Sequence, residues 1–435
     1  MAFYKFNINK LLKSRYEYIV IVPQKITLAI LNTLIILKVL WLEGGPCGVG
    51  IIMSLNIFSI LFTSFSIRFL SNINIIKKFL FSSHIVLIIA ILFALSDSIL
   101  SLYLSSLMIF MSGYSIYYSI YSMINSIGYK TKSIELSRFE KIGGLAWILG
   151  LLLGVLLTLS LPINYIFLIV SIFPLTGIYL TKRIFNNYYV RRNYIDFDGE
   201  PEASEEINIF NFSFSLNAMK DWMLHNIYVI NKVSKIIVIL TIIQFSTALA
   251  STQLTPYILS LGYSPSHVYV LSLASSLIST FTYEKAGTEF NGRESLLRAM
   301  SYRILTYAFF IILIVTNYVY TYAIGYFSLL AVYILMGFSW AYTYININSI
   351  LIELNKKELS VVNLIGYLGF ILGALLSSII ILYASFTMTL ILSLLTLLIE
   401  SAYILYDKIN FHRNIFNPVR INVLIHNIHI NSHSR

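Results

Sequence analysis

Residues 135–154 read ELSRFEKIGGLAWILGLLLG, and residues 358–377 read ELSVVNLIGYLGFILGALLS. Aligned without gaps at an offset of 223, the two stretches agree at eleven of twenty positions. Leucine and isoleucine matches are common between apolar helices. The shared ELS and the matched pairs Gly143/Gly366 and Gly150/Gly373 therefore count for more. This internal similarity predicts a chain built from two copies of one structural unit.

The composition places this repeat in a membrane. Of the 435 residues, 58% are hydrophobic and 11% are charged, and the mean hydropathy is +0.80. Soluble globular chains carry about 25% charged residues. The apolar runs extend for roughly 20 residues, enough for a helix to cross about 30 Å of hydrocarbon. Because the runs are continuously apolar rather than alternating, they predict an all-α membrane protein and not a β-barrel.

Twelve transmembrane helices are expected from these runs. Every second connection between them is basic. Of the 30 Lys and Arg residues, 28 fall in these connections, in the termini or at the adjoining ends of spans, and the exceptions, Lys25 and Lys38, lie deeper inside the first span. Basic connections stay on the cytoplasmic side. This predicts a multi-pass plasma (cytoplasmic) membrane protein with both termini in the cytoplasm. The predicted spans are, to within a few residues, 17–41, 48–69, 79–97, 99–122, 138–160, 163–181, 235–261, 265–283, 301–317, 321–348, 359–383 and 386–406.

One long connection divides the chain into six plus six spans. It begins with a basic stretch, continues through an acidic one (DFDGEPEASEE, 196–206), and ends in a segment with partial helical periodicity. We expect an N-terminal bundle over 1–181, a cytoplasmic linker over 182–234, a C-terminal bundle over 235–407 and a cytoplasmic tail over 408–435. Both copies of the repeat begin a span that runs from the inside outward. The two bundles should therefore be related by a parallel pseudo-repeat.

Small residues line one face of each copy of the repeat. Such faces let helices approach closely in a bilayer. The faces have two interpretations: ordinary tight packing, or a sliding contact that helps the halves move and so contributes to gating. They comprise Gly143, Gly150 and Gly154 in the fifth span, and Gly366, Gly369 and Gly373 in the eleventh.

Over nearly its whole length the chain resembles the major facilitator superfamily of transporters. Twelve spans, inside termini, a long inner linker and glycine-rich fifth and eleventh helices carry the likeness, and Arg138 and Gly144 ahead of Gly150 look like the family's fifth-helix pattern. The resemblance implies a secondary transporter that moves a small organic solute by alternating access. In that mechanism the two six-helix halves rock around a central cavity.

A second family motif, an acid followed by Gly-Arg, lies in the connection between spans eight and nine as Glu289, Gly292 and Arg293. Its first-half counterpart keeps only the basic pair Lys77 and Lys78, without the acid and the glycine of an inter-helix charge lock.

In the resembled fold, spans one, four, seven and ten line the cavity, and each has a polar face at helical spacing here. Lys25 in the first span would favour an anionic substrate or act as a gating charge, unless it snorkels to the interface. The amides, hydroxyls and rings suit a neutral or weakly charged organic solute. The candidates are Lys25 and Asn32; Ser112, Ser115 and Tyr118; Gln244, Ser251 and Thr255; and Trp340, Tyr344 and Asn348.

Apart from Glu17 at the boundary of the first span, these four spans contain no Asp or Glu, which argues mildly against a carboxylate-based proton symport. Glu400, in the twelfth span, is expected to pack or to snorkel. His84 is expected to cap a helix or face the inner interface, and His267 to lie at the outer surface.

Other functional classes have weaker support. Asp196 and Asp198 form a D-x-D, but in an acidic linker without an α/β domain, so we do not expect an enzyme. Neither a cofactor nor a metal site is expected, and we expect no nucleic acid partner, because the net charge of +11 reflects membrane orientation. The expected partners of a monomer are the lipid bilayer and a small-molecule substrate. The alternative is an exporter or lipid-linked oligosaccharide flippase of a different 12–14 helix fold.

Overall fold

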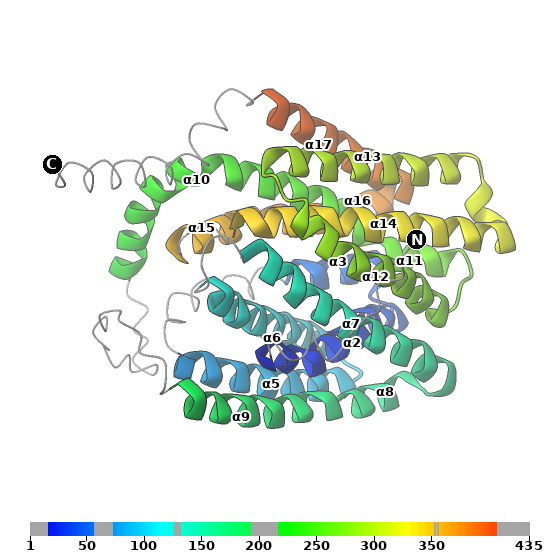
Figure 1. The fold of residues 1–435 in the computed structure, drawn as a ribbon. Helices are drawn as coiled ribbons and strands as arrows, with labels where there is room; N and C mark the ends of the chain where they lie inside the picture. The colour runs from blue at the N-terminus through cyan, green and yellow to red at the C-terminus, as the bar shows by residue number, and fades with distance from the viewer. Residues whose placement is uncertain are drawn as a thin grey trace, which may run out of the picture.

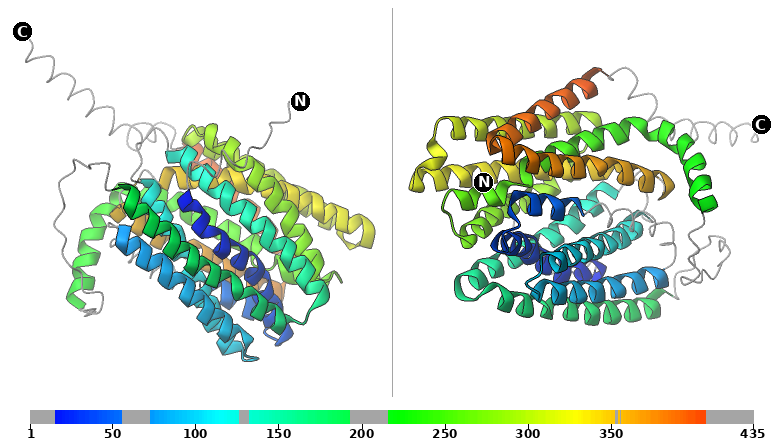
Figure 2. Two further views of the ribbon diagram at one scale, coloured as in Figure 1. Left: turned by 60° about the horizontal axis from the view of Figure 1, so that its bottom comes forward. Right: turned by 180° about the vertical axis from the view of Figure 1, so that it is seen from behind.

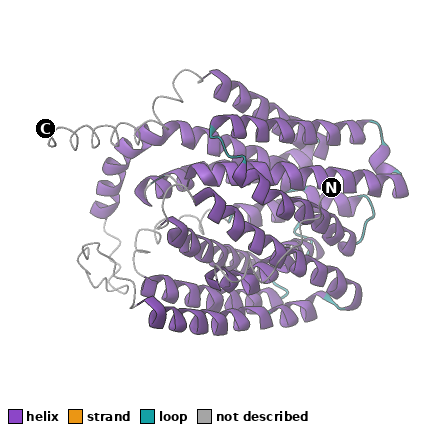
Figure 3. Ribbon diagram, in the orientation of Figure 1, coloured by secondary structure: helices purple, strands orange, loops and turns teal. Residues whose placement is uncertain are grey.

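A computed structural model describes residues 16–55, 73–125, 132–192, 216–351, 354 and 356–406. Helices account for the regular structure throughout these ranges, and they contain no strand (Figure 3). On length and composition alone, nine helices of the described ranges could cross a bilayer, and two shorter apolar helices accompany them.

The helices follow the predicted order of twelve spans. The first, sixth, seventh and eleventh spans each consist of two consecutive helical segments. The second is seen only in its opening helix, because 56–72 lie outside the described residues. The bounds are η1 (Tyr16–Val20), α2 (Ile21–Trp41), α3 (Gly45–Ser54), α5 (Ile73–Leu95), α6 (Ile99–Asn125), α7 (Lys132–Ser160), α8 (Ile163–Val170), α9 (Ile172–Arg192), α10 (Leu216–Ser251), α11 (Leu254–Ser260), α12 (Pro265–Thr288), α13 (Arg293–Val315), η4 (Tyr318–Tyr320), α14 (Tyr322–Leu351), α15 (Lys356–Gly366), α16 (Leu368–Tyr383) and α17 (Phe386–Tyr406).

Prolines explain two of the interruptions inside spans. A proline in a helix removes one backbone hydrogen bond and its ring clashes with the carbonyl four residues earlier. Pro256 accordingly follows the break between α10 and α11, and Pro174 follows the break between α8 and α9. The prolines thus account for ends of α10 and α8 that the hydrophobic pattern alone does not predict.

The helices form two side-by-side bundles. In Figure 1 the N-terminal spans, blue to green, lie mainly below the C-terminal ones, green to red, with α9 and α17 at the outer edges. The bundles meet along two helix pairs, α7 with α12 and α3 with α16. The view from behind in Figure 2 shows α3 beside the orange α16. The end of the molecule where α9 stops and α10 starts is called the linker end, and the opposite end the far end.

The repeat seen in the sequence recurs in the packing. A Cβ added to Gly150 on α7 would lie 2.6 Å from the carbonyl oxygen of Ile26 and 2.8 Å from Ala29 Cβ, both on α2. At the equivalent Gly373 on α16, an added Cβ would meet the Phe245 carbonyl oxygen and would lie 2.9 Å from Ala248 Cβ on α10. The fifth span therefore packs on the first as the eleventh packs on the seventh.

The predicted linker 182–234 is partly helical. Helix α9 continues to Arg192 and α10 begins at Leu216, whereas 193–215 lie outside the described residues. Figure 1 shows the first turns of α10 bending away from the bundle at the linker end. The tail from 408 onward is likewise outside the described residues, and the division into domains stays a prediction.

Neutral contacts close the far end between the two halves. The ring of Tyr269 on α12 packs tightly against Gly154 of α7, where an added Cβ would lie 2.6 Å from Tyr269 Cδ1. The Tyr269 hydroxyl donates a hydrogen bond to the Ile30 carbonyl on α2 at 2.7 Å. The Gln253 amide donates to the Pro46 carbonyl at 3.0 Å and to Ser378 Oγ at 2.8 Å. Tyr269 and Gln253 are fully buried, so this end is sealed.

Candidate functional site

A cavity of about 350 Å³ lies between the two halves. Residues of α2, α6, α10 and α14 form most of its wall, so the first, fourth, seventh and tenth spans surround it. Helix α7 and the junction of α15 with α16 complete the wall. The wall includes Ile21, the first residue of α2, and Leu351, the last of α14. The cavity therefore extends toward the linker end, on the opposite side from the sealed far end.

Six of the residues predicted from the sequence lie on this wall: Lys25, Asn32, Gln244, Trp340, Tyr344 and Asn348. Lys25 is the only charged side chain among the described residues that form it. Ile26 on the first span and Phe245 on the seventh are equivalent, because they contact the matched glycines Gly150 and Gly373, and they are 219 residues apart. The same offset relates Lys25 to Gln244, so Gln244 occupies on the seventh span the position that Lys25 occupies on the first.

The other predicted candidates lie elsewhere. Ser112 and Ser115 are buried beside the wall, and the Ser115 hydroxyl donates to its own helix at the Met111 carbonyl, 2.6 Å away. Ser251 and Thr255 are not on the wall because α10 ends at Ser251 and the chain continues in a new helix. The side chain of Tyr118 lies outside what the structure describes.

Gln24 is a wall residue that the polar-face pattern missed. Its amide donates to the Ser112 carbonyl at 2.9 Å and approaches Ser112 Oγ at 3.5 Å, tying α2 to α6. Gln24 directly precedes Lys25, and this position in the sequence could have identified it as a candidate wall residue.

A buried acid lies next to Lys25. A Cβ added to Gly143 on α7 would be 3.3 Å from Lys25 Cε, so the lysine stem runs along α7. Glu140, one turn earlier on α7, is 4% exposed. The Tyr344 hydroxyl, from the other half, donates to Glu140 Oε1 at 3.2 Å. Lys25 lies on the cavity wall, and Glu140, behind the wall, is hydrogen-bonded to the opposite half.

Aromatic rings cover much of the wall on the side of α14. The rings of Trp340 and Tyr344 stack with centroids 5.4 Å apart. Arg303 of α13 lies behind them, with its guanidinium 5.7 Å from the Trp340 ring centroid. Arg303 also donates to Thr247 Oγ1 at 2.7 Å, so one buried cation contacts two wall residues from outside the cavity.

Arg303 and Glu400 of α17 are both buried. Glu400 is fully buried, so it does not snorkel. Within the described residues its two carboxylate oxygens accept no hydrogen bond. Arg303 falls at the edge of its predicted span, so we counted it with the basic residues of an inner connection and did not predict its buried position.

Lys38, the other basic residue inside a span, makes contacts that stabilise the fold and does not lie on the cavity wall. Its ammonium is fully buried and donates to the Ala94 carbonyl at 2.8 Å, the Leu95 carbonyl at 3.2 Å and the Asn164 amide oxygen at 2.9 Å. It pairs with Asp97 at 3.1 Å. A cation at the last carbonyls of α5 stabilises that helix end.

His84 differs from its predicted place. It is fully buried, its ring lies against Gly177 of α9, and neither ring nitrogen has a hydrogen-bond partner among the described residues. The expectation that it caps a helix or faces the interface is therefore wrong. His267 lies at the far end and caps α12 together with Ser264.

The small residues of the fifth and eleventh spans mostly pack within their own halves. Gly143 contacts α2, and Gly366 and Gly369 contact α10. Gly154 alone among the six candidates lies against the opposite half. The structure therefore shows that these glycines pack closely against neighbouring helices. A role for them in gating stays a prediction.

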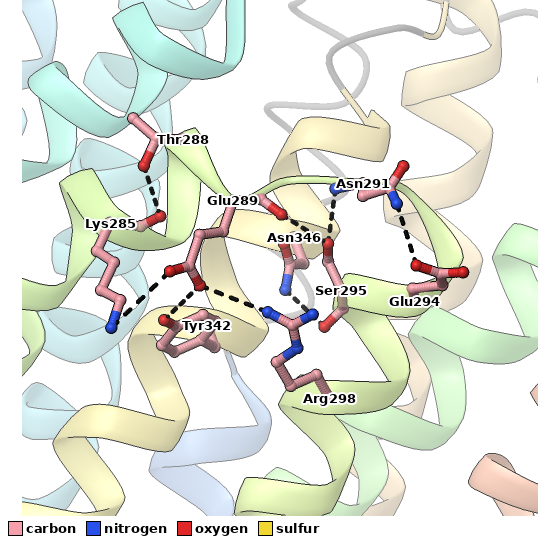
Figure 4. Close-up of polar contacts among 9 residues, drawn as sticks. All are labelled: Lys285, Thr288, Glu289, Asn291, Glu294, Ser295, Arg298, Tyr342 and Asn346. Carbon is pink, nitrogen blue, oxygen red and sulfur yellow. Dashed lines mark hydrogen bonds and ion pairs between the residues drawn. The ribbon is translucent and has the colours of Figure 1, made fainter.

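The Glu289, Gly292 and Arg293 motif lies at the turn between α12 and α13, and Figure 4 shows the contacts of Glu289 there. Gly292 has φ +56°, which a side chain would strain. Glu289 accepts a hydrogen bond from the Tyr342 hydroxyl at 2.8 Å and pairs with Arg298 at 3.5 Å. Arg293 instead donates to the Leu405 carbonyl of α17 at 3.3 Å. In this half the motif joins α12, α13, α14 and α17.

Among the described residues, no group of three or more His, Cys, Asp or Glu side chains could hold a metal ion.

The fold is similar to that of two transporters of known structure. The nucleoside transporter NupG matches 92% of this chain over 100% of its own length, with a TM-score of 0.61 and 12% identity. The human organic anion transporter MFSD10 matches with the same coverages, a TM-score of 0.59 and 10% identity. No family model matches the sequence, and no curated protein is similar to it at a significant level. The expected all-α, twelve-helix fold is confirmed.

Proposed function

We propose that this protein is a secondary transporter that moves a small organic solute by alternating access between its two halves. The observation that carries the proposal is the cavity between the halves, which is sealed at the far end and extends to the linker end. A site at the interface of two repeats, reached from one side at a time, is the arrangement that rocking transporters use.

The residues of the cavity wall indicate which kind of solute the cavity can bind. Its described polar groups are amides and hydroxyls with one cation, Lys25, and its apolar part is rich in aromatic rings. A volume of about 350 Å³ is at the small end for ligand pockets. The solute should therefore be small and ring-containing or otherwise planar. The two similar structures are a nucleoside transporter and an organic anion transporter, so this fold serves neutral and anionic solutes.

The orientation follows from charge. Basic connections lie on the side of the linker end, which we place in the cytoplasm of a plasma membrane protein that works as a monomer. In that orientation the cavity is open toward the cytoplasm.

The test begins with a thermal-shift screen of the purified protein against a metabolite library, since a ligand that binds only the folded state raises its stability. Flux of each stabilising compound is then measured in reconstituted vesicles. Lys25→Ala should lower flux about tenfold or more, because a hydrogen-bonded charged contact contributes ~1.5–3 kcal/mol. Lys25→Arg is the matched control that keeps the charge. Unchanged flux for Lys25→Ala, at equal amounts of folded protein, would remove Lys25 from the binding site.

A further inference from the structure

A buried arginine lies directly behind the aromatic part of the cavity wall, and it bears on which solutes the cavity accepts. We propose that Arg303 is a positioning residue for the solute site, an inference that rests on the proposed transport function. Arg303 holds the ring of Trp340 in place as a stacking surface for a planar ring that is uncharged or anionic. Its charge also excludes organic cations from that surface.

Arg303 is an unusual residue for the interior of a membrane helix. It belongs to α13, which contributes no residue to the described wall, and it is 4% exposed. Its Nη1 has no hydrogen-bond partner among the described residues, and neither have the carboxylate oxygens of Glu400, so no hydrogen-bonded ion pair joins these two buried groups. A buried charge without such a pair is costly, and in a membrane protein it indicates a function.

The guanidinium group of Arg303 is oriented from its own helix. Its Nε and Nη2 atoms each donate a hydrogen bond to the hydroxyl of Tyr307, one turn later on α13, at 3.1 Å. Tyr307 is also buried, so water does not compete for these bonds. Two bonds from a rigid, planar group to one acceptor fix the direction in which that group points.

Two side chains of the wall contact the oriented guanidinium group. Arg303 Nη2 donates to Thr247 Oγ1 at 2.7 Å, and Thr247 donates its only hydroxyl proton to the Ile243 carbonyl at 2.6 Å. The Thr247 hydroxyl therefore has no proton left to offer a solute. The guanidinium group also lies over the ring of Trp340, 5.7 Å from the ring centroid. A desolvated cation–π contact of this kind favours one orientation of the ring.

The oriented ring of Trp340 provides a flat surface for a solute. Trp340 is 37% exposed and lies on the wall, and the ring of Tyr344 stacks on it with an angle of 27° between the planes. Stacking between aromatic rings is favourable beyond the area that the rings bury. A solute gains this in full only if Trp340 is already in place, because ordering a free side chain on binding costs entropy.

The same contact bears on the charge of the solute. Aromatic side chains commonly attract organic cations through the negative face of the ring. Here the Arg303 guanidinium group already interacts with the Trp340 ring, and Lys25 places a second positive charge on the wall. A cationic solute would be repelled by both charges in surroundings that screen them poorly. The aromatic wall is therefore suited to neutral and anionic rings.

The test compares three probes that differ in one property at a time. Benzamide has a planar ring, cyclohexanecarboxamide has the same amide on a saturated ring, and benzyltrimethylammonium has an aromatic ring and a permanent positive charge. Dissociation constants for the purified full-length chain are obtained from the rise of the thermal midpoint with probe concentration. The wild type should bind benzamide about fivefold tighter than cyclohexanecarboxamide, and benzyltrimethylammonium most weakly.

Arg303→Met removes the charge and the contact but keeps a long side chain. The preference for benzamide over cyclohexanecarboxamide should fall to about twofold or less, because Trp340 is no longer held. Benzyltrimethylammonium should bind about tenfold tighter, because one of the two repelling charges is gone. Arg303→Lys keeps the charge without the planar group, so it should lose the preference for benzamide and still exclude the cation.

Tyr307→Phe tests the same idea if Arg303→Met does not fold. It removes the two hydrogen bonds that orient the guanidinium group and keeps the charge, so it should lower the preference for benzamide and leave the cation excluded. The matched control is Lys38→Met, which removes a buried cation that does not lie on the wall. This control should lower the thermal midpoint without changing either ratio of affinities.

The outcomes separate this proposal from the proposed function. An Arg303→Met protein that binds all three probes more weakly by one common factor would show a purely structural role and overturn the proposal. A wild type that binds the saturated amide as tightly as benzamide, binds the cation best or binds none of the probes would also overturn it. Transport would still stand, since it requires a solute in the cavity but not its stacking. Vesicles that accumulate no compound from the library screen would instead count against transport itself.

Discussion

The close packing of Gly150 allows a quantitative test of the helix contact that defines each half. In Gly150→Ala the new methyl group would lie 2.6 Å from the Ile26 carbonyl oxygen and 2.8 Å from Ala29 Cβ. Ordinary contacts between heavy atoms lie at ~3.5–4.0 Å. Helix α7 must therefore move away from α2 by roughly 1 Å, against packing as dense as that of an organic crystal.

The expected loss combines two opposing terms. Overpacking of this kind costs ~1–3 kcal/mol. Replacing glycine by alanine inside a helix returns about 0.5–1 kcal/mol, because alanine loses less conformational entropy. The net effect should be a destabilisation of ~1–2 kcal/mol, visible as a lower midpoint when the purified protein is heated in detergent.

Two further glycines serve as comparisons. Gly113→Ala, on α6, meets its nearest atom at 3.5 Å, so it receives the helix gain without the clash and should not lower the midpoint. Gly373→Ala repeats the Gly150 clash in the other half and should behave like Gly150→Ala. If Gly150→Ala is as stable as Gly113→Ala, the close approach of α7 to α2 is not as described.

Two other predictions concern charge and orientation. Lys38→Met should destabilise the protein by ~1–3 kcal/mol, because it leaves buried carbonyl groups without a donor. Asp97→Asn, at a side chain 60% exposed, should cost less than about 1 kcal/mol in the same thermal assay, and the reverse order would contradict the buried role of Lys38. Cys47, the single cysteine, is exposed near the start of α3 at the far end. A membrane-impermeant maleimide should label it in intact cells but not label a Cys47→Ser control, and labelling only after lysis would reverse the proposed orientation.

The order of the spans could be predicted because it depends on features written along the chain. Hydrophobic length and the placement of Lys and Arg are local properties, and the glycines of the 135–154 and 358–377 repeat marked helices that pack closely on their neighbours. Pro256 and Pro174 also gave a local signal for the breaks they cause, but an apolar run conceals such a break.

The residues of the cavity wall were harder to predict, because a polar face on a helix does not determine which side of that helix turns toward the cavity. On α6 the predicted serines, Ser112 and Ser115, turn from the cavity, whereas Ile109, Gly113 and Ile116 line it. A serine inside a helix can bond to its own backbone, as Ser115 does, and then needs no polar surroundings.

Glu140 was missed for a different reason. It lies within three residues of two basic side chains at the start of its span, so it was counted with a charged inner connection. Only the packing of α7 on α2 brings its turn of the helix near Lys25. Packing between residues so far apart in the chain leaves no pattern in one sequence.

The two ends of the cavity differ in the chemistry that holds the halves together. Among the described residues, the contacts across the far end are hydrogen bonds and van der Waals contacts between neutral groups, including those of Tyr269 and Gln253. At the linker end the partly exposed pair Lys141–Glu284 crosses between the halves. Dissolved ions screen exposed charges over about 8–10 Å but act weakly on neutral buried contacts. Raising the ionic strength should therefore loosen one end only, so salt would act on this protein as a directional signal, shifting it toward the conformation open at the linker end.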